Sequence, residues 1–171
     1  MSRKHKACKP ATGGGPGIVL VLLLVLALVA ASLVLLVLDW QETRWLLPLL
    51  LGGDALLVYF IWTAPGRLGY RVEKDKLIIE TFAGKREIEK SAIRAVRKVD
   101  YRLGFKIIGS EMPGYNVGTF KSNLGSVQAF VGVKRGRGVL LELKNDEKIL
   151  INPRDPERCL KPLEIDLEEE S

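Results

Sequence analysis

The feature that most constrains the fold is an uncharged apolar run near the N-terminus. Residues 17–38 read GIVLVLLLVLALVAASLVLLVL and contain no Asp, Glu, Lys or Arg. About 20 consecutive apolar residues are enough for a helix to cross the hydrocarbon core of a bilayer. A second apolar run at residues 46–63 contains one charged residue, Asp54. The sequence therefore predicts a membrane protein with a two-helix transmembrane hairpin at residues 17–63.

The first run also shares some features with a signal peptide. It follows the basic start MSRKHKACK and contains small residues at positions 30–32. However, its apolar core exceeds the roughly 7–15 residues of a signal peptide, and the second run follows closely. We therefore interpret the first run as a retained helix.

Basic residues flanking the two runs predict the orientation of the hairpin. The basic tail at residues 1–16 contains four Lys or Arg, and residues 64–76 contain four more. The connector at residues 39–44 contains only one, Arg44. By the positive-inside rule, we expect a multi-pass protein of the cell membrane whose termini and C-terminal domain are cytoplasmic.

Residues 66–165 have the composition of a folded domain, and residues 166–171 form an acidic tail. The only histidine is His5, and the only cysteines are Cys8 and Cys159. This set cannot form a conventional zinc site, and it leaves the domain without a histidine base for a Ser–His hydrolase. We therefore expect no enzyme activity, no cofactor and no metal. Two distant cysteines also fit a reducing interior, where no disulfide framework is expected.

Short apolar runs separated by turn signals predict about seven antiparallel strands in this domain. Residues 92–100 fit either a strand or a helical turn. Asp155 and Pro156 are typical of a helix start, and Pro162 should shorten that helix. This order is that of a PH-like antiparallel β-barrel with a C-terminal helix, so the fold class is an α+β membrane protein. An OB-fold is the rival, but it has five strands and places its helix in the middle of the chain.

Two clusters of residues resemble the bacterial PH domain family, and together they cover most of residues 69–163. The first cluster comprises Pro113, Gly114, Tyr115, Gly118 and Phe120, and the second comprises Asn152, Pro153, Asp155, Pro156 and Glu157. The pair of preceding helices also fits the family. Pro162 departs from it, because the family's helix usually continues there. The resemblance implies a PH-like fold without catalytic activity, and it does not specify a ligand.

Residues 109–126, GSEMPGYNVGTFKSNLGS, loosely resemble a phosphate loop. A P-loop places its lysine directly after a glycine, within a strand–loop–helix unit. Here Lys121 follows Gly118 by three positions, and the flanking segments are antiparallel strands. We therefore predict a long irregular connection anchored in the barrel by Tyr115 and Phe120, with partner contact as the alternative.

Basic residues suggest a contact surface for a partner or for lipid. A cytoplasmic domain beside an anionic leaflet gains about 1 kcal/mol for each basic residue near the surface. A solvated surface without a ligand is the alternative, and no pattern supports nucleic-acid binding. The candidate contacts are Arg94, Arg97, Lys98, Arg102, Lys121, Lys134, Arg135 and Arg137, with Lys106 nearby.

Asp54 follows Gly52 and Gly53 within the second apolar run. Small residues permit close packing of membrane helices, and an intramembrane carboxyl group is a functional candidate. We predict a packing seam here, with a proton or ion relay as the alternative.

Two functions remain open. One is a non-enzymatic, membrane-anchored module that binds a protein partner or anionic lipid at the inner leaflet. The other is a small oligomeric subunit of a membrane transport or secretion complex that acts through its helices.

Overall fold

The computed structural model describes residues 8–11, 16–38, 47–63, 65–73, 75–161 and 168–169. The chain forms two compact units. One contains residues 14–63, and the other contains residues 1–13 together with residues 64–171. Segments on both sides of the first unit therefore belong to the second.

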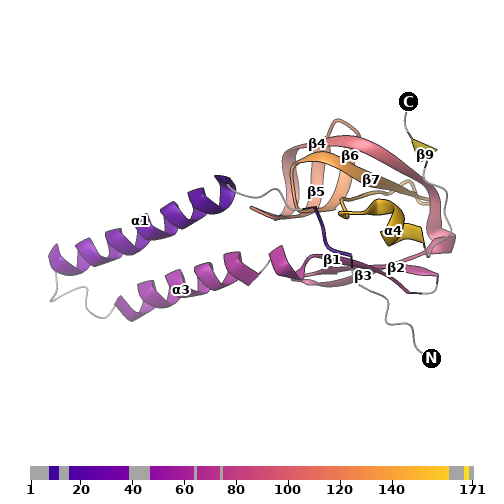
Figure 1. Ribbon diagram of the computed structural model, residues 1–171. Coiled ribbons are helices and arrows are strands. Elements are labelled where there is room, and N and C mark those ends of the chain that lie inside the picture. The colour runs from indigo at the N-terminus through magenta and orange to yellow at the C-terminus, as the bar shows by residue number, and fades with distance from the viewer. Residues whose placement is uncertain are drawn as a thin grey trace. The chain divides into compact units, whose positions relative to one another are not determined.

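The first unit contains two helices that lie side by side (Figure 1). α1 spans Pro16–Leu38 and α3 spans Leu47–Thr63, close to the two apolar runs. Several described leucines are exposed, among them Leu26 and Leu56. In the described part of the chain, no helix is long and apolar enough to cross a membrane. The prediction of two transmembrane helices is not confirmed by the structure.

The second unit begins with a short 3-10 helix and a three-stranded antiparallel sheet. The elements are η1 (Pro65–Arg67), β1 (Gly69–Glu73), β2 (Lys76–Thr81) and β3 (Gly84–Glu89). Leu77 and Ile79 on β2 are buried, as is Ile88 on β3. One face of this sheet therefore contributes to the core.

A second sheet closes on itself through the long strand β4. The 3-10 turn η2 (Lys90–Ala92) leads into β4 (Ile93–Met112), whose first half pairs with β7 and whose second half pairs with β5. Because β5, β6, β8 and β7 are neighbours in that order, these pairings close a small barrel. Its other strands are β5 (Tyr115–Ser122), β6 (Gly125–Val131), β7 (Arg135–Leu143) and β8 (Lys148–Ile151), and β9 (Glu168–Glu169) adds to β4.

The barrel corrects two of the sequence predictions. Residues 109–126 do not form an irregular connection, because they form β5 with the adjoining ends of β4 and β6, separated by two tight turns. In addition, β6 and β8 pair in parallel, whereas only antiparallel strands are predicted. Residues 92–100, which fit either a strand or a helical turn, lie almost entirely in β4.

Within the described residues, buried apolar side chains form two core clusters. The larger cluster joins residues of both sheets with α4, and it includes Tyr70, Leu77 and Leu141. The smaller cluster lies among the strands of the barrel and includes Phe120 and Leu150. The two sheets are thus held together mainly by apolar burial.

The C-terminal helix α4 spans Pro156–Leu160 and lies beside β1 (Figure 1). The Asp155 carboxylate accepts a hydrogen bond from the Arg158 backbone N–H at 3.0 Å, so it caps the helix as the sequence predicts. Leu160 and Cys159 are buried. Pro162 lies outside the described residues.

Residues 8–11 form a strap on the second unit, although they precede α1 in the chain. The Cys8 N–H donates to the Tyr70 carbonyl at 2.7 Å, and the Tyr70 N–H donates to the Cys8 carbonyl at 2.9 Å. Farther along the strap, the Ala11 N–H donates to the Asn152 carbonyl at 2.7 Å. The strap therefore contacts both the first sheet and the end of the barrel.

A disulfide joins Cys8 of the strap to Cys159 of α4, with 5.9 Å between their Cα atoms. The expectation that these cysteines stay unpaired is therefore wrong. They are 151 positions apart, and the bonds of the strap to Tyr70 and to residues 152–154 bring them together.

Candidate interaction surface

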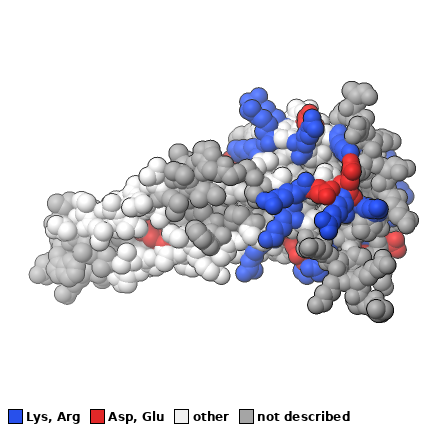
Figure 2. Space-filling model, viewed as in Figure 1, with Lys and Arg blue, Asp and Glu red and all other residues white. Residues whose placement is uncertain are grey.

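The predicted basic contacts lie on three strands of the barrel and on the turn before β7. Figure 2 shows Lys and Arg gathered over one face of the second unit, with acidic side chains among them. Four of the eight lie on the first half of β4, Lys121 lies on β5, and the other three lie at or just before the start of β7.

Five of these eight side chains have acidic partners. Arg94 contacts Glu142 at 3.3 Å and Asp146 at 2.9 Å, and these hydrogen bonds raise the pKa of its guanidinium group. Arg97 bonds to the same Glu142. The other pairs are Lys98 with Glu157, Lys134 with Glu111, and Arg137 with Asp100. These charges are balanced locally, so they are poor candidates for binding an external anion.

The remaining three, Arg102, Lys121 and Arg135, form no ion pair within the described residues, and all three are exposed. Arg102 on β4 lies directly opposite Arg135 on β7. Like charges facing each other across two strands destabilise a sheet. A bound anion would relieve this repulsion, so these three residues form the part of the predicted surface best suited to a negatively charged ligand.

Exposed apolar side chains adjoin these cations on β4. Phe105, Ile107 and Ile108 are 77%, 51% and 69% exposed. Lys106 lies between the first two of them and has no acidic partner within the described chain. The exposure of this segment was not among the sequence predictions. The run FKII at residues 105–108 indicates this exposure, because its apolar and polar residues do not alternate as they do in a half-buried strand.

The two predicted loop anchors are both buried, but on strand β5. Tyr115 belongs to the larger core cluster and Phe120 to the smaller one. The Tyr115 hydroxyl also accepts a hydrogen bond from the Phe82 backbone N–H at 3.1 Å. This bond ties the turn between β4 and β5 to the turn between β2 and β3.

A family model for the bacterial PH domain matches residues 68–166, which is more than half of the chain. The chain belongs to the bacterial PH domain family. The resemblance noted from the sequence is thereby confirmed, as is a β-rich, PH-like domain with a C-terminal helix. No curated protein and no solved structure matches the chain significantly. PH domains are generally non-catalytic modules that bind proteins or lipids, and nothing in this chain shows an enzyme activity.

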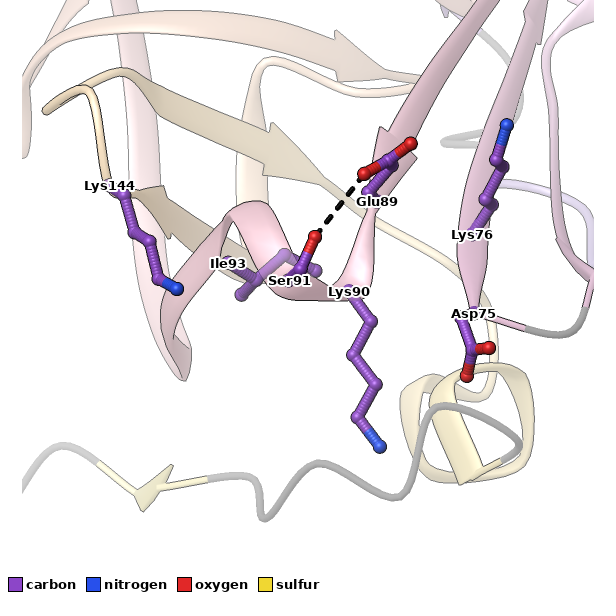
Figure 3. A pocket seen from close by; sticks show the side chains of 7 residues that line it. All are labelled: Asp75, Lys76, Glu89, Lys90, Ser91, Ile93 and Lys144. Atoms are coloured by element: carbon purple, nitrogen blue, oxygen red, sulfur yellow. Dashed lines mark hydrogen bonds between the residues drawn. The ribbon is translucent and has the colours of Figure 1, made fainter.

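The PH domain also has a shallow hollow of about 640 Å³ where β2, β3, β4 and β7 approach one another. Figure 3 shows its lining side chains, which include three lysines, Lys76, Lys90 and Lys144. Lys76 bonds to Glu87 at 3.1 Å, which raises the pKa of its ammonium group. The Ser91 hydroxyl donates to Glu89 at 3.3 Å.

Charges of both signs line this hollow of the PH domain, so it does not concentrate one charge for a ligand. In the described part of the chain, no three His, Cys, Asp or Glu residues gather as they would around a metal ion.

The predicted packing residues lie on α3, outside the PH domain. A Cβ added to Gly52 or Gly53 would meet no described atom within 4 Å. The Asp54 Oδ2 atom is buried and has no hydrogen-bond partner within the described residues. Both glycines therefore lack a close neighbour among the residues that the structure describes.

Proposed function

We propose that the chain is a non-enzymatic module, tethered to a membrane by residues 17–63, whose PH domain binds a negatively charged lipid or protein surface. The observation that carries this proposal is the exposed set Arg102, Lys121 and Arg135. These cations have no acidic partner in the described chain, and two of them face each other across β4 and β7. A bound anion would reduce the electrostatic repulsion among basic groups arranged in this way.

Two features support the membrane tether. Residues 17–38 contain no charged residue, and residues 46–63 contain one. The strap at residues 8–11 and the PH domain after Thr63 belong to one folded unit. The intervening segment must therefore return the chain to the side from which it started, as a two-helix hairpin does. The basic flanks favour the cytoplasmic side.

The test uses the full-length chain held in nanodiscs of neutral lipid. We expect it to capture added vesicles that contain anionic lipid, or a polyglutamate peptide, at low salt. Replacing Arg102, Lys121 and Arg135 with Gln should weaken capture about tenfold or more, since each cation contributes about 1 kcal/mol. Capture of vesicles identifies a lipid surface, and capture of the peptide alone identifies an acidic protein surface.

The matched control removes the same charge elsewhere on the PH domain. Lys85 lies on β3, Arg158 on α4 and Lys161 at its end, and all three are exposed. Replacing these three with Gln should leave most of the capture intact. If neither probe is captured, or if both triple variants lose capture equally, the proposed binding function is contradicted.

A second function, oligomerisation through the helices, is favoured by one specific observation. Asp54 Oδ2 is buried without a partner in the described chain, and the two glycines before it have no close neighbour among the described atoms. A second protomer could supply a hydrogen bond and pack closely there, as in a subunit of a transport or secretion complex. In this case Asp54→Leu should reduce chemical crosslinking between protomers in membranes, whereas Asp54→Asn should retain it. Equal crosslinking in both variants would exclude this role.

A further inference from the structure

In the β4–β5 hairpin, a short stretch of β4 exposes apolar side chains that an isolated domain would be expected to bury. We define the hairpin patch as Phe105, Ile107 and Ile108, each more than half exposed. Single exposed apolar residues are common on protein surfaces, but contiguous exposed patches often mark binding sites. Here three large apolar side chains fall within four consecutive positions of one strand.

The exposure of the patch follows from how β4 pairs with β5. Between Leu103 and Lys106, and again between Lys106 and Ile108, the pairing register shifts. Such bulges insert extra residues into one strand and redirect their side chains. Leu103 remains buried, but the simple alternation that would bury Phe105 and Ile107 after it is broken. The strand pairing itself therefore turns the patch outward.

Unpaired cations accompany the patch. Lys106 lies between Phe105 and Ile107 in the sequence and is half-buried, opposite Phe120 of β5. Arg102 precedes the patch on β4, and Lys121 lies on the neighbouring strand. None of the three has an acidic partner in the described chain. A Cβ added at Gly104 would lie 3.3 Å from the Lys121 carbonyl oxygen, so the backbone of Lys121 runs beside the start of the patch.

The acidic residues on either side of the patch along β4 are already neutralised. Asp100 pairs with Arg137, and Glu111 pairs with Lys134. The patch is thus an apolar surface bordered by uncompensated positive charge.

We infer that the hairpin patch inserts into the interfacial layer of an anionic membrane, with Arg102, Lys106 and Lys121 at the lipid phosphates. This inference rests on the proposed function, and it specifies lipid as the ligand. Interfacial binding strength depends on buried apolar area together with attraction between basic residues and anionic lipid. Lys and Arg near such a surface keep their charged ends at the headgroups while their stems lie along apolar area.

The size of the patch argues against a protein as its occupant. A stable protein–protein interface buries about 800 Å² on each partner, which takes roughly 20–30 residues. Three apolar side chains fall far short of that requirement. They suffice for interfacial insertion, because a tethered domain already lies close to the bilayer and needs little additional affinity.

The test places a fluorescent reporter in the patch of the full-length chain. The three native tryptophans are replaced with Phe, and Phe105→Trp supplies a single tryptophan at an exposed position. The protein is reconstituted into nanodiscs whose lipids carry bromine on their acyl chains. We expect bromine to quench this tryptophan at least about twofold in discs with anionic lipid, and much less in neutral discs.

Two further variants separate insertion from other causes of quenching. Lys85→Trp on β3, in the same background, reports an exposed site away from the patch and should not be quenched. Lys106→Gln with Lys121→Gln should reduce quenching of the Phe105→Trp reporter by about half or more.

The inference is overturned if the Phe105→Trp reporter is quenched no more than the Lys85→Trp reporter. It is also overturned if the Phe105→Trp reporter is quenched equally in neutral and anionic discs. If the chain captures anionic vesicles but the reporter is not quenched, only the insertion is overturned and the proposed binding function stands. If neither capture nor quenching is observed, the insertion and the proposed binding function are both overturned.

Discussion

Gly109 and Gly118 face each other across the β4–β5 hairpin, and both have positive φ values, 121° and 139°. A Cβ atom at Gly109 would lie within 3.0 Å of the Val117 carbonyl oxygen, and one at Gly118 within 3.0 Å of the Ile108 carbonyl oxygen. Real Cβ atoms do not come so close to backbone atoms. Glycine is therefore required at both positions by conformation and by space.

We expect Gly118→Ala to lower the free energy of unfolding of the full-length chain by about 2–4 kcal/mol, because it combines an unfavourable φ with a backbone clash. Urea unfolding followed by circular dichroism measures the effect. Gly66→Ala is the control, since a Cβ there would meet no described atom within 4 Å. Equal stability of the two variants would show that the close approach does not exist.

The same glycines explain why the sequence predicts a long irregular connection at residues 109–126, where the structure has strands. Gly, Pro and Asn indicate a break in regular structure, but they do not show whether one long loop or two tight turns follow. Sequence patterns predicted structure correctly where the interaction joins neighbouring residues, as at the Asp155 helix cap. The outward turn of Phe105 depends on register shifts against another strand, which a single sequence does not show.

Asn152 holds the strap at Ala11, 141 positions away, through its side chain as well as its backbone. Its Nδ2 donates to the Ala11 carbonyl at 3.1 Å, and its Oδ1 accepts from the Gly132 N–H at 2.9 Å. No local pattern could reveal this pairing, although Asn152 belongs to the second cluster of family-like residues. The structure thus assigns a physical role to a residue that the sequence identified only by resemblance.

Asn152→Ala should destabilise the chain by about 2–3 kcal/mol, because it leaves buried backbone groups without partners. Hydrogen exchange at the Ala11 amide should also accelerate about tenfold or more as the strap loosens. Asn145→Ala, at an exposed turn, is the control and should cost no more than about 1 kcal/mol. Unchanged exchange at Ala11 in Asn152→Ala would mean that the strap is held by other contacts.

Arg86 on β3 links the first sheet to the turn between β7 and β8. Its guanidinium group makes two hydrogen bonds to the Glu147 carboxylate, at 2.7 and 2.8 Å, and both side chains are about one third exposed. Both of these bonds come from Nη2, and Nη1 donates to the Gln128 side chain. We expect Arg86→Lys to lower the unfolding free energy by about 1 kcal/mol, because a single ammonium group cannot hold Glu147 and Gln128 together as the planar guanidinium does.

The exposed pair Arg137–Asp100 provides the comparison for Arg86. Its atoms are 3.5 Å apart, and its side chains are 92% and 81% exposed. Arg137→Lys should change stability by less than about 0.5 kcal/mol, as is typical of solvated ion pairs. Similar losses in the two variants would mean that the Arg86 pair contributes no more than an ordinary surface contact.

The buried hydroxyl group of Tyr70 should make the folded chain less stable at alkaline pH. Burial raises the pKa of its hydroxyl above the ordinary value of 10.0, and burial also raises the pKa of Tyr101. Because the folded pKa values are raised, this contribution to stability is complete below pH 10 and declines as pH rises further. The melting temperature should fall between about pH 10 and 11, and Tyr70→Phe should make that fall shallower. Tyr59→Phe, at an exposed position on α3, should leave the profile unchanged.

The Cys8–Cys159 disulfide tests the proposed cytoplasmic location of the PH domain. The cytoplasm keeps most protein thiols reduced, so a cytoplasmic domain should hold this pair as two thiols in growing cells. Rapid alkylation of whole cells should then modify both cysteines, and a mild oxidant given beforehand should protect both. Cys8→Ser removes the partner and should leave Cys159 alkylated after either treatment.

In the purified chain, closing the disulfide should raise the unfolding free energy by about 2–5 kcal/mol, because it constrains a very long loop in the unfolded chain. Urea unfolding with and without reductant measures this difference, and Cys8→Ser should be insensitive to the reductant. If alkylation finds the pair already oxidised in untreated cells, the PH domain lies in an oxidising compartment. The orientation inferred from the basic flanks would then be reversed, while the strap would still place both flanks of residues 14–63 on one side.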